Sequence, residues 1–400
     1  MADLFWPGDH RAGDLMSNLT FLTAMVTVED AWLDVLVRSG IAPVEAKADL
    51  TATVGPDDVE CIAVRAEDDG SPVVGLVALL RERTGGQPAR WLHRGLTSQD
   101  VVDTALMLCV RGATARIDDE LAAQVTALSR LVDEYREAPA LARTLSQPAL
   151  PTTLGAKIAG WLNGVLDAAD ALAELPPLPV QIGGAVGTLA AATELTGDPD
   201  RAVALVGDMA GALGLAAGRP WHTSRAMITR IGDALVTCCD AWAHVAGDVV
   251  TGSRAEVGEF VEGRGGGSST MPHKRNPVLS VLIRRTALTA PALGAALHVA
   301  SADSVDERSS GGWQSELSTL CILTRRTVVA AAQTSDLLAN LQPSAARAAA
   351  NLAAAGDLVA EQRVMADLIG APALPNYAGA SQRLIDATLE RAHNHVKERP

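Results

Sequence analysis

The chain contains few aromatic residues and an excess of acidic side chains. Aromatic residues make up 3% of the 400 residues although 48% are hydrophobic, so the core must consist mainly of Ala, Leu and Val. Alanine and leucine are strong helix formers, and this composition therefore favours an all-α fold. The net charge of -14 argues against nucleic acid as a partner, because nucleic acid binds basic surfaces. A small anionic substrate is still compatible, since a few local Arg and Lys side chains can set the field of one pocket.

The sequence also lacks the signatures of metal, nucleotide and disulfide chemistry. The five cysteines show no C-x-x-C spacing, and no grouping of His, Cys, Asp or Glu has the spacing of metal ligands. No P-loop, dinucleotide fingerprint or Gly-x-Ser-x-Gly motif occurs. We therefore expect reduced, buried thiols in a cytoplasmic protein that needs no cofactor. No apolar run approaches about 18 residues and the N-terminus has no basic region, which predicts neither a membrane span nor a signal peptide.

One polar, glycine-rich stretch, residues 263–277, differs from this aliphatic background. It reads Gly-Arg-Gly-Gly-Gly-Ser-Ser-Thr-Met-Pro-His-Lys-Arg-Asn-Pro and contains Lys274, one of only four lysines in the chain. Asn276 is a favourable N-cap and Pro277 a favourable first helical residue, so a helix is predicted to begin there. Free N–H groups and the helix dipole at such an end favour an anion. Gly-Ser-rich stretches are usually linkers, but the motif that ends this one favours a functional loop.

Helical periodicity along the rest of the chain predicts an extended bundle of long helices. Thr97 and Asp100 form a capping-box pattern before one of them. The predicted long helices cover residues 20–39, 97–136, 152–175, 227–249, 277–293 and 317–341. We expect an N-terminal helical domain (1–96), a central long-helix bundle (97–342) and a short C-terminal helical domain (343–400).

The stretch from Gly267 to Pro277 closely resembles the signature of the fumarase/aspartase superfamily. A second stretch, His93-Arg-Gly-Leu-Thr-Ser-Gln-Asp100, resembles the other motif of this superfamily, in the form found in its adenylosuccinate lyase and carboxymuconate cycloisomerase branch. The resemblance covers most of residues 90–320. It implies removal of a proton next to a carboxylate in a small polycarboxylate substrate, without a cofactor. It also implies a homotetramer in which each site draws loops from three subunits.

The resemblance also implies roles for individual residues. Ser268, or alternatively Ser269, is the expected catalytic base, and His93 is an auxiliary acid or a simple hydrogen-bond donor. The three glycines at 265–267 would let the loop close over substrate. Arg225 and Arg308 are candidates for the additional carboxylates of a tricarboxylate. The complete set of expected substrate-binding residues is Thr97, Ser98, Arg143, Thr144, Gln147, Thr223, Arg225, Lys274, Asn276 and Arg308.

Leu145 is the most informative departure from the superfamily pattern. The segment from Ala142 to Gln147 resembles a Gly-Arg-Thr-His segment whose histidine helps to protonate the leaving group, and leucine cannot do so. A carboxylate, with a pKa of about 4, leaves without that help. The sequence therefore favours interconversion of 3-carboxy-cis,cis-muconate and its lactone. The alternatives are an adenylosuccinate-lyase-like C–N lyase and a catalytically silent structural homologue.

Overall fold

The computed structural model describes residues 3–264, 266–375 and 377–398, so one of the three glycines, Gly265, lies outside the described residues. The helices are α1 (Asn18–Arg38), α2 (Asp58–Asp69), α3 (Pro72–Thr84), α4 (Gly86–Trp91), α5 (Ser98–Glu134), α6 (Leu154–Ala173), α7 (Ala190–Thr196), α8 (Pro199–Leu213), α9 (Ala226–Gly252), α10 (Val278–Ala302), α11 (Gly312–Asn340), α12 (Ala345–Ala354), α13 (Ala360–Ile369) and α14 (Ser381–Glu398). The strands are β1 (Pro139–Thr144), β2 (Gln147–Thr153), β3 (Phe260–Glu262) and β4 (Leu341–Pro343).

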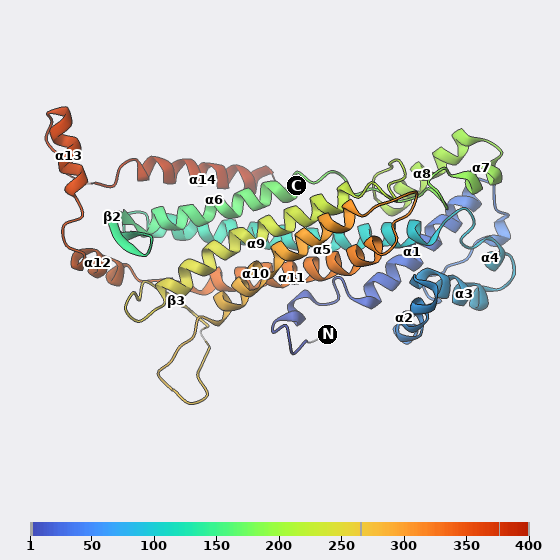
Figure 1. Ribbon diagram of the computed structural model, residues 1–400, viewed down its shortest axis with the longest axis horizontal. Coiled ribbons are helices and arrows are strands. Elements are labelled where there is room, and N and C mark those ends of the chain that lie inside the picture. Colours follow the sequence, from blue (N-terminus) through green and yellow to red (C-terminus); the bar gives the residue numbers. More distant parts are fainter. Residues whose placement is uncertain (1–2, 265, 376, 399–400) are drawn as a thin grey trace.

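The long helices α5, α6, α9, α10 and α11 run along one another and give the molecule its elongated shape (Figure 1). α1 packs on α5 at one end, and α14 returns along α6. The core is aliphatic, with a few large side chains such as Trp32, Trp161 and Trp242 fully buried within it. The all-α prediction is confirmed, and the strands form only short two-stranded antiparallel ladders, β1–β2 and β3–β4. The division into domains at residues 96 and 342 stays a prediction.

The ends of the long helices agree only partly with the sequence pattern, since α9 and α10 continue to Gly252 and Ala302, beyond the predicted ends at residues 249 and 293. α1, α5 and α6 begin and end within two residues of the predicted limits, whereas α11 begins at Gly312, before the predicted start at residue 317. The segment with Leu145 forms a β-hairpin, in which Leu145 and Ser146 make the turn with φ values of 49° and 66°. Leu145 is 98% exposed at this tip. Since left-handed backbone favours Gly or Asn, periodicity and residue preference did not predict this turn.

Helix α10 corrects a prediction about its N-terminus. It begins at Val278, Pro277 is its N-cap, and Asn276 does not cap it. Instead the buried carboxylate of Glu262 accepts hydrogen bonds from the backbone N–H of Leu279 (3.1 Å) and of Ser280 (2.7 Å). A carboxylate satisfies free N–H groups and complements the helix dipole better than an amide does. The anion predicted at this helix end is therefore supplied by the chain itself.

Helix α10 is also long and apolar enough to cross a membrane by length and composition, contrary to the prediction that no segment is. A core helix of a helical bundle meets the same criterion, and α10 packs along α9 and α11 (Figure 1). Only 33% of the most apolar 18-residue stretch of α10 is buried within the chain. Its exposed apolar residues include Val281, Leu288 and Val299. The single chain thus leaves an apolar face of α10 uncovered.

The cysteines are free, and most are buried as expected. Cys109, Cys238 and Cys239 are buried, Cys321 is partly buried, and Cys61 is exposed. Burial raises the pKa of the Cys321 thiol to about 11 and the pKa of the Cys109 thiol to about 12. Because the thiolate is the reactive form, these buried cysteines are poor nucleophiles and serve as small core side chains.

Candidate functional site

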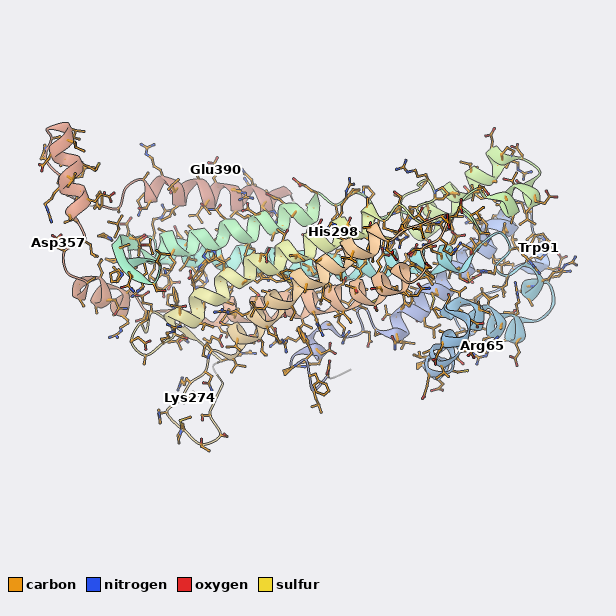
Figure 2. All side chains as sticks on the ribbon, viewed as in Figure 1. Arg65, Trp91, Lys274, His298, Asp357 and Glu390 are labelled. Carbon is orange, nitrogen blue, oxygen red and sulfur yellow. The ribbon has the colours of Figure 1, made fainter. Side chains whose placement is uncertain are left out.

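The predicted site residues lie in three separate regions of the chain. Thr97 and Ser98 begin α5 at one end of the bundle, next to α4 (Figure 1). Lys274 lies on a loop that projects away from the helices (Figure 2). Arg143 lies in the β1–β2 hairpin at the opposite end from α4 (Figure 1). The structure therefore brings together only part of the predicted set within one chain.

A buried carboxylate organises the beginning of α5. Asp100 has no exposed surface, and its two oxygens face groups from three segments of the chain. Its partners, at 2.9–3.1 Å, are the backbone N–H groups of Thr97, Gly183 and Gly184, the amide of Gln181 and Nε2 of His222. The capping box predicted from Thr97 and Asp100 is thus present, but Asp100 also ties residues 181–184 and His222 to the helix end. Sequence reasoning recognised only its capping role.

Arg225 lies beside this network and is almost completely buried, with 3% of its side chain exposed. Its guanidinium donates to Asp103 at 2.7 and 3.0 Å and to Glu316 at 2.5, 3.1 and 3.2 Å. It also lies 4.5 Å from the centre of the Trp221 ring. All three guanidinium nitrogens therefore have partners within the chain. This geometry favours a structural role for Arg225 over the substrate contact predicted from the sequence.

The charges in this cluster stabilise one another. Burial alone would lower the pKa of Arg225, but the charges of Asp103 and Glu316 outweigh it and raise the pKa above its ordinary value. Burial is the largest influence on Glu316 and raises the pKa of its carboxyl, against the opposing effect of Arg225. Asp103 receives a further hydrogen bond from the Trp313 indole at 3.0 Å. Arg225 is therefore the central cation of a buried ion-pair triad.

Other predicted residues lie on neighbouring loops at this end of the bundle. Arg308 donates to the carbonyl oxygen of Ala185 at 2.7 Å, which places it beside the segment that Asp100 holds. Thr223 is partly buried in the turn between His222 and Arg225. His93 precedes α5 with a φ of 63°, and its Nδ1 lies 2.6 Å from Oε1 of Glu29. This end therefore holds His93, Thr97, Ser98, Thr223, Arg225 and Arg308.

The described residues of the segment 263–277 form an arm with a fixed stem. Gly266 and Asn276 pair through both backbone groups, at 2.9 and 2.8 Å, and the Gly263 N–H donates to the Asn340 carbonyl at 3.1 Å. A Cβ at Gly263 would lie 2.4 Å from that carbonyl oxygen, and one at Gly266 would lie 2.2 Å from a Val278 methyl. Both positions need glycine because of close packing, which for Gly266 is a reason different from the flexibility expected of residues 265–267.

The tip of the arm carries the predicted catalytic residues. The Ser268 hydroxyl accepts hydrogen bonds from the backbone N–H of Met271 (3.1 Å) and Thr270 (3.4 Å), and the Asn276 amide donates to the Gly267 carbonyl (3.3 Å). Ser269 and Lys274 are exposed. In the part of the chain that the structure describes, the hydrogen bonds of Ser268 all stay within the tip. The tip must therefore meet another surface before Ser268 can act as a base.

The hairpin holds the remaining predicted residues. Arg143 donates to the buried carboxylate of Glu259 at 2.9 and 3.2 Å, which anchors β1 to the segment before β3. Thr144 and Gln147 flank the turn and are exposed beside Leu145. The exposed side chains of residues 144–148 are available to a neighbouring surface, whereas Arg143 is engaged within the chain.

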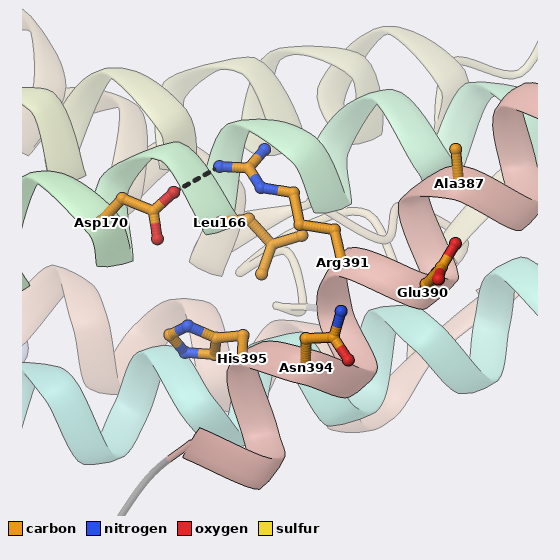
Figure 3. Close-up of a pocket in the computed structure, with 7 residues that line it drawn as sticks. All are labelled: Leu166, Asp170, Ala387, Glu390, Arg391, Asn394 and His395. Carbon is orange, nitrogen blue, oxygen red and sulfur yellow. Dashed lines mark hydrogen bonds and ion pairs between the residues drawn. The ribbon is translucent and has the colours of Figure 1, made fainter.

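No group of three or more His, Cys, Asp or Glu side chains that could hold a metal ion occurs among the described residues. A cavity of 370 Å³ lies between α6 and α14, as Figure 3 shows, and its lining includes Arg391, Asp170 and His395. Arg391 is paired with Asp170 at 2.6 Å and with Asp167 at 2.7 Å. None of the predicted site residues lines this cavity, so it is not a candidate active site.

A bundle of long helices with a hydroxyl-bearing helix end and a Ser-Lys arm defines a helical lyase scaffold. A family model described as Lyase matches residues 19–291, and the chain belongs to this family, which is part of the fumarase/aspartase superfamily. The superfamily predicted from the two motifs is thereby confirmed.

Two relatives and one solved structure show how broad this similarity is. The chain is 40% identical over 366 residues to the nitrosuccinate lyase of Streptomyces davaonensis, covering 88% of this chain and 77% of that protein. It is 33% identical over 399 residues to the 3-carboxy-cis,cis-muconate cycloisomerase of Bradyrhizobium diazoefficiens, covering 96% and 84%. The crystal structure of the 3-carboxy-cis,cis-muconate lactonizing enzyme from Pseudomonas putida matches with a TM-score of 0.80 at 29% identity, covering 96% and 86%. The motifs had not suggested the similarity to a nitrosuccinate lyase.

Proposed function

We propose that the chain catalyses a β-elimination whose leaving group departs without protonation, with nitrosuccinate as the substrate. Leu145 carries this proposal, because it stands where the superfamily resemblance places the histidine that assists a basic leaving group. Nitrite is the anion of an acid about as strong as a carboxylic acid and is a good leaving group. Of the relatives described above, the one with the higher identity, 40%, is a nitrosuccinate lyase.

In the proposed reaction Ser268, in its alkoxide form, takes a proton from the carbon next to the one that bears the nitro group and becomes a hydroxyl. The electron pair of the C–H bond forms the C=C bond of fumarate, and the C–N bond pair leaves with nitrite. The hydroxyls of Thr97 and Ser98 and the N–H of Ser98 at the start of α5 would bind a carboxylate, together with Lys274 and Asn276. These groups would stabilise the dianionic intermediate that forms on proton removal.

The charge available at the α5 end favours a dicarboxylate over a tricarboxylate. The guanidinium of Arg225 is already paired with Asp103 and Glu316. Arg225 therefore cannot bind a third substrate carboxylate without breaking a buried ion pair. Of the two arginines predicted to bind the additional substrate carboxylates, only Arg308 then remains for this role. Conversion of 3-carboxy-cis,cis-muconate is the second candidate, supported by 33% identity over 96% of the chain to a cycloisomerase and by the same need for an unassisted leaving group.

A direct assay separates these candidates. Purified protein is incubated with nitrosuccinate, carboxymuconolactone or adenylosuccinate, and fumarate, nitrite and ring opening are followed by absorbance and colorimetry. We expect stoichiometric fumarate and nitrite from nitrosuccinate and little turnover of adenylosuccinate, whose amine needs protonation. Turnover of the lactone alone would establish the second candidate, and turnover of adenylosuccinate alone would show that Leu145 has been misread.

We also propose that the active unit is a homotetramer. The Ser268 tip, the α5 end and the hairpin tip lie apart within one chain, and the exposed apolar residues of α10 need a partner surface. Light scattering should give four times the chain mass of 41.5 kDa. Co-assembly of inactive Ser268→Ala and Ser98→Ala chains should restore partial activity, because some sites then combine two intact motifs. An active monomer would contradict this proposal.

A further inference from the structure

Glu29 is a buried carboxylate that none of the roles above uses. It lies in α1 with no exposed surface, among the apolar residues Leu22, Met25, Trp32 and Leu36, which share its face of the helix. Its Oε1 lies 2.6 Å from Nδ1 of His93, and its Oε2 has no hydrogen-bond partner among the described residues. Burying a carboxylate in such surroundings costs several kcal/mol in general, so a specific gain must compensate for it.

The turn that carries His93 is already held to α1 by a second contact. The Trp32 indole, one helical turn after Glu29, donates to the carbonyl oxygen of Arg94 at 2.7 Å. Gly95, with a φ of 92°, packs against the Trp32 ring. Since Trp32 anchors the turn without a charge, anchoring alone does not account for a buried carboxylate at position 29.

His93 has the features of a side chain held in one orientation for use. Its φ of 63° is unfavourable for a residue with a Cβ, and such strain persists where surrounding contacts enforce it. An ionised carboxylate only accepts hydrogen bonds, so when Glu29 is ionised Nδ1 carries the hydrogen in their contact. Nε2 is then the ring nitrogen left to contact a ligand, and the side chain is 19% exposed, four residues before Thr97.

We propose that Glu29 is a positioning residue that sets the tautomer and orientation of His93 during the elimination; this inference rests on the proposed function. The carboxylate keeps hydrogen on Nδ1 and so presents Nε2 to the substrate as an acceptor, in place of the acid or donor role expected from the sequence. A carboxylate behind a working imidazole is a general way to fix the ring and strengthen its basicity. Glutamine at position 29 can accept from Nδ1 or donate to it, and so cannot fix the tautomer.

The matched pair Glu29→Gln and Trp32→Phe tests this role. Glu29→Gln is expected to lower kcat about 10- to 100-fold, with KM changed less than about threefold and Tm nearly unchanged. Glu29→Asp should retain more activity, because it keeps the charge. Trp32→Phe should lower Tm while kcat stays near wild type.

A double-mutant test asks whether Glu29 and His93 act as one unit. In a His93→Asn background, Glu29→Gln should therefore lower kcat little further. Additive losses, or equal behaviour of the Gln and Phe variants, would overturn the proposal.

A second measurement does not depend on turnover. Diethyl pyrocarbonate attacks the unprotonated ring nitrogen of histidine, and mass spectrometry of peptides gives the rate for each site. Glu29→Gln should slow modification of His93 several-fold and leave that of exposed His273, on the arm, unchanged. An unchanged rate at His93 would overturn the positioning role whether or not nitrosuccinate is the substrate. If modification of His93 is slowed but the protein does not turn over nitrosuccinate, the positioning role of Glu29 is supported and only the proposed substrate is rejected.

Discussion

Replacing Ser268 with alanine is expected to abolish elimination, lowering kcat by about 10³-fold or more with only a small change in KM. Proton transfer by a positioned side chain contributes about 10²- to 10⁴-fold, and Ser268 is the proposed base. The variant should fold normally, because Ser268 hydrogen-bonds only within the exposed tip in the described residues. Steady-state kinetics of nitrite release, with Tm as a check of folding, measure the effect.

Ser269→Ala is the matched control, since it removes the same atoms from the neighbouring exposed position. We expect it to retain most of the activity. If Ser269→Ala were inactive and Ser268→Ala active, Ser269 would be the base, which was the alternative left open by the sequence. If both variants kept full activity, the arm would not carry the base at all, and the proposed mechanism would be wrong.

Replacing Arg225 with methionine is expected to have the largest effect on stability, a loss of about 3–5 kcal/mol. Breaking a buried ion pair by removing one partner leaves an uncompensated buried charge, and here two carboxylates, Asp103 and Glu316, lose their shared cation. The expected readout is a large fall in Tm and in soluble yield. Arg308→Met, which removes a hydrogen bond to a carbonyl oxygen near the surface, should change Tm little.

The triple variant Arg225→Met, Asp103→Leu, Glu316→Leu distinguishes structure from substrate binding. Removing all three charges together should recover much of the lost stability, because an apolar replacement of a buried ion-pair network is often neutral or better. A single Arg225→Met variant that folds with unchanged Tm and only a raised KM would instead show that Arg225 contacts substrate. That result would also revive the tricarboxylate substrate.

Most of the long helices follow from short-range rules. Apolar residues at helical spacing and an aromatic-poor, Ala- and Leu-rich composition predict α1, α5 and α6 to within two residues. Thr97 and Asp100 indicate the beginning of α5 because a capping box involves only neighbouring residues. The hairpin at Leu145 was missed because its two turn residues adopt a left-handed backbone that Leu and Ser rarely take.

The candidate site was predictable as a list of motifs and not as an arrangement. The burial of Glu29 could have been predicted, because it shares the helical spacing of Met25, Trp32 and Leu36. A carboxylate on such an apolar face needs a hydrogen-bond partner. That partner, His93, is 64 residues away, and no local pattern identifies it. The partners of Arg225 likewise lie 122 and 91 residues away along the chain.

The amino-acid sequence by itself determined the helical class and the superfamily, and it supplied the list of candidate site residues, because these depend on local periodicity and on contiguous motifs. Tertiary structure alone decided which charges are already paired. It showed that Glu262 occupies the N-terminus of α10 and that Asp103 and Glu316 hold Arg225, since carboxylates and cations find one another through packing across the bundle. Which groups stay free to bind a ligand is a property of the fold, because burial and pairing join residues far apart in the chain.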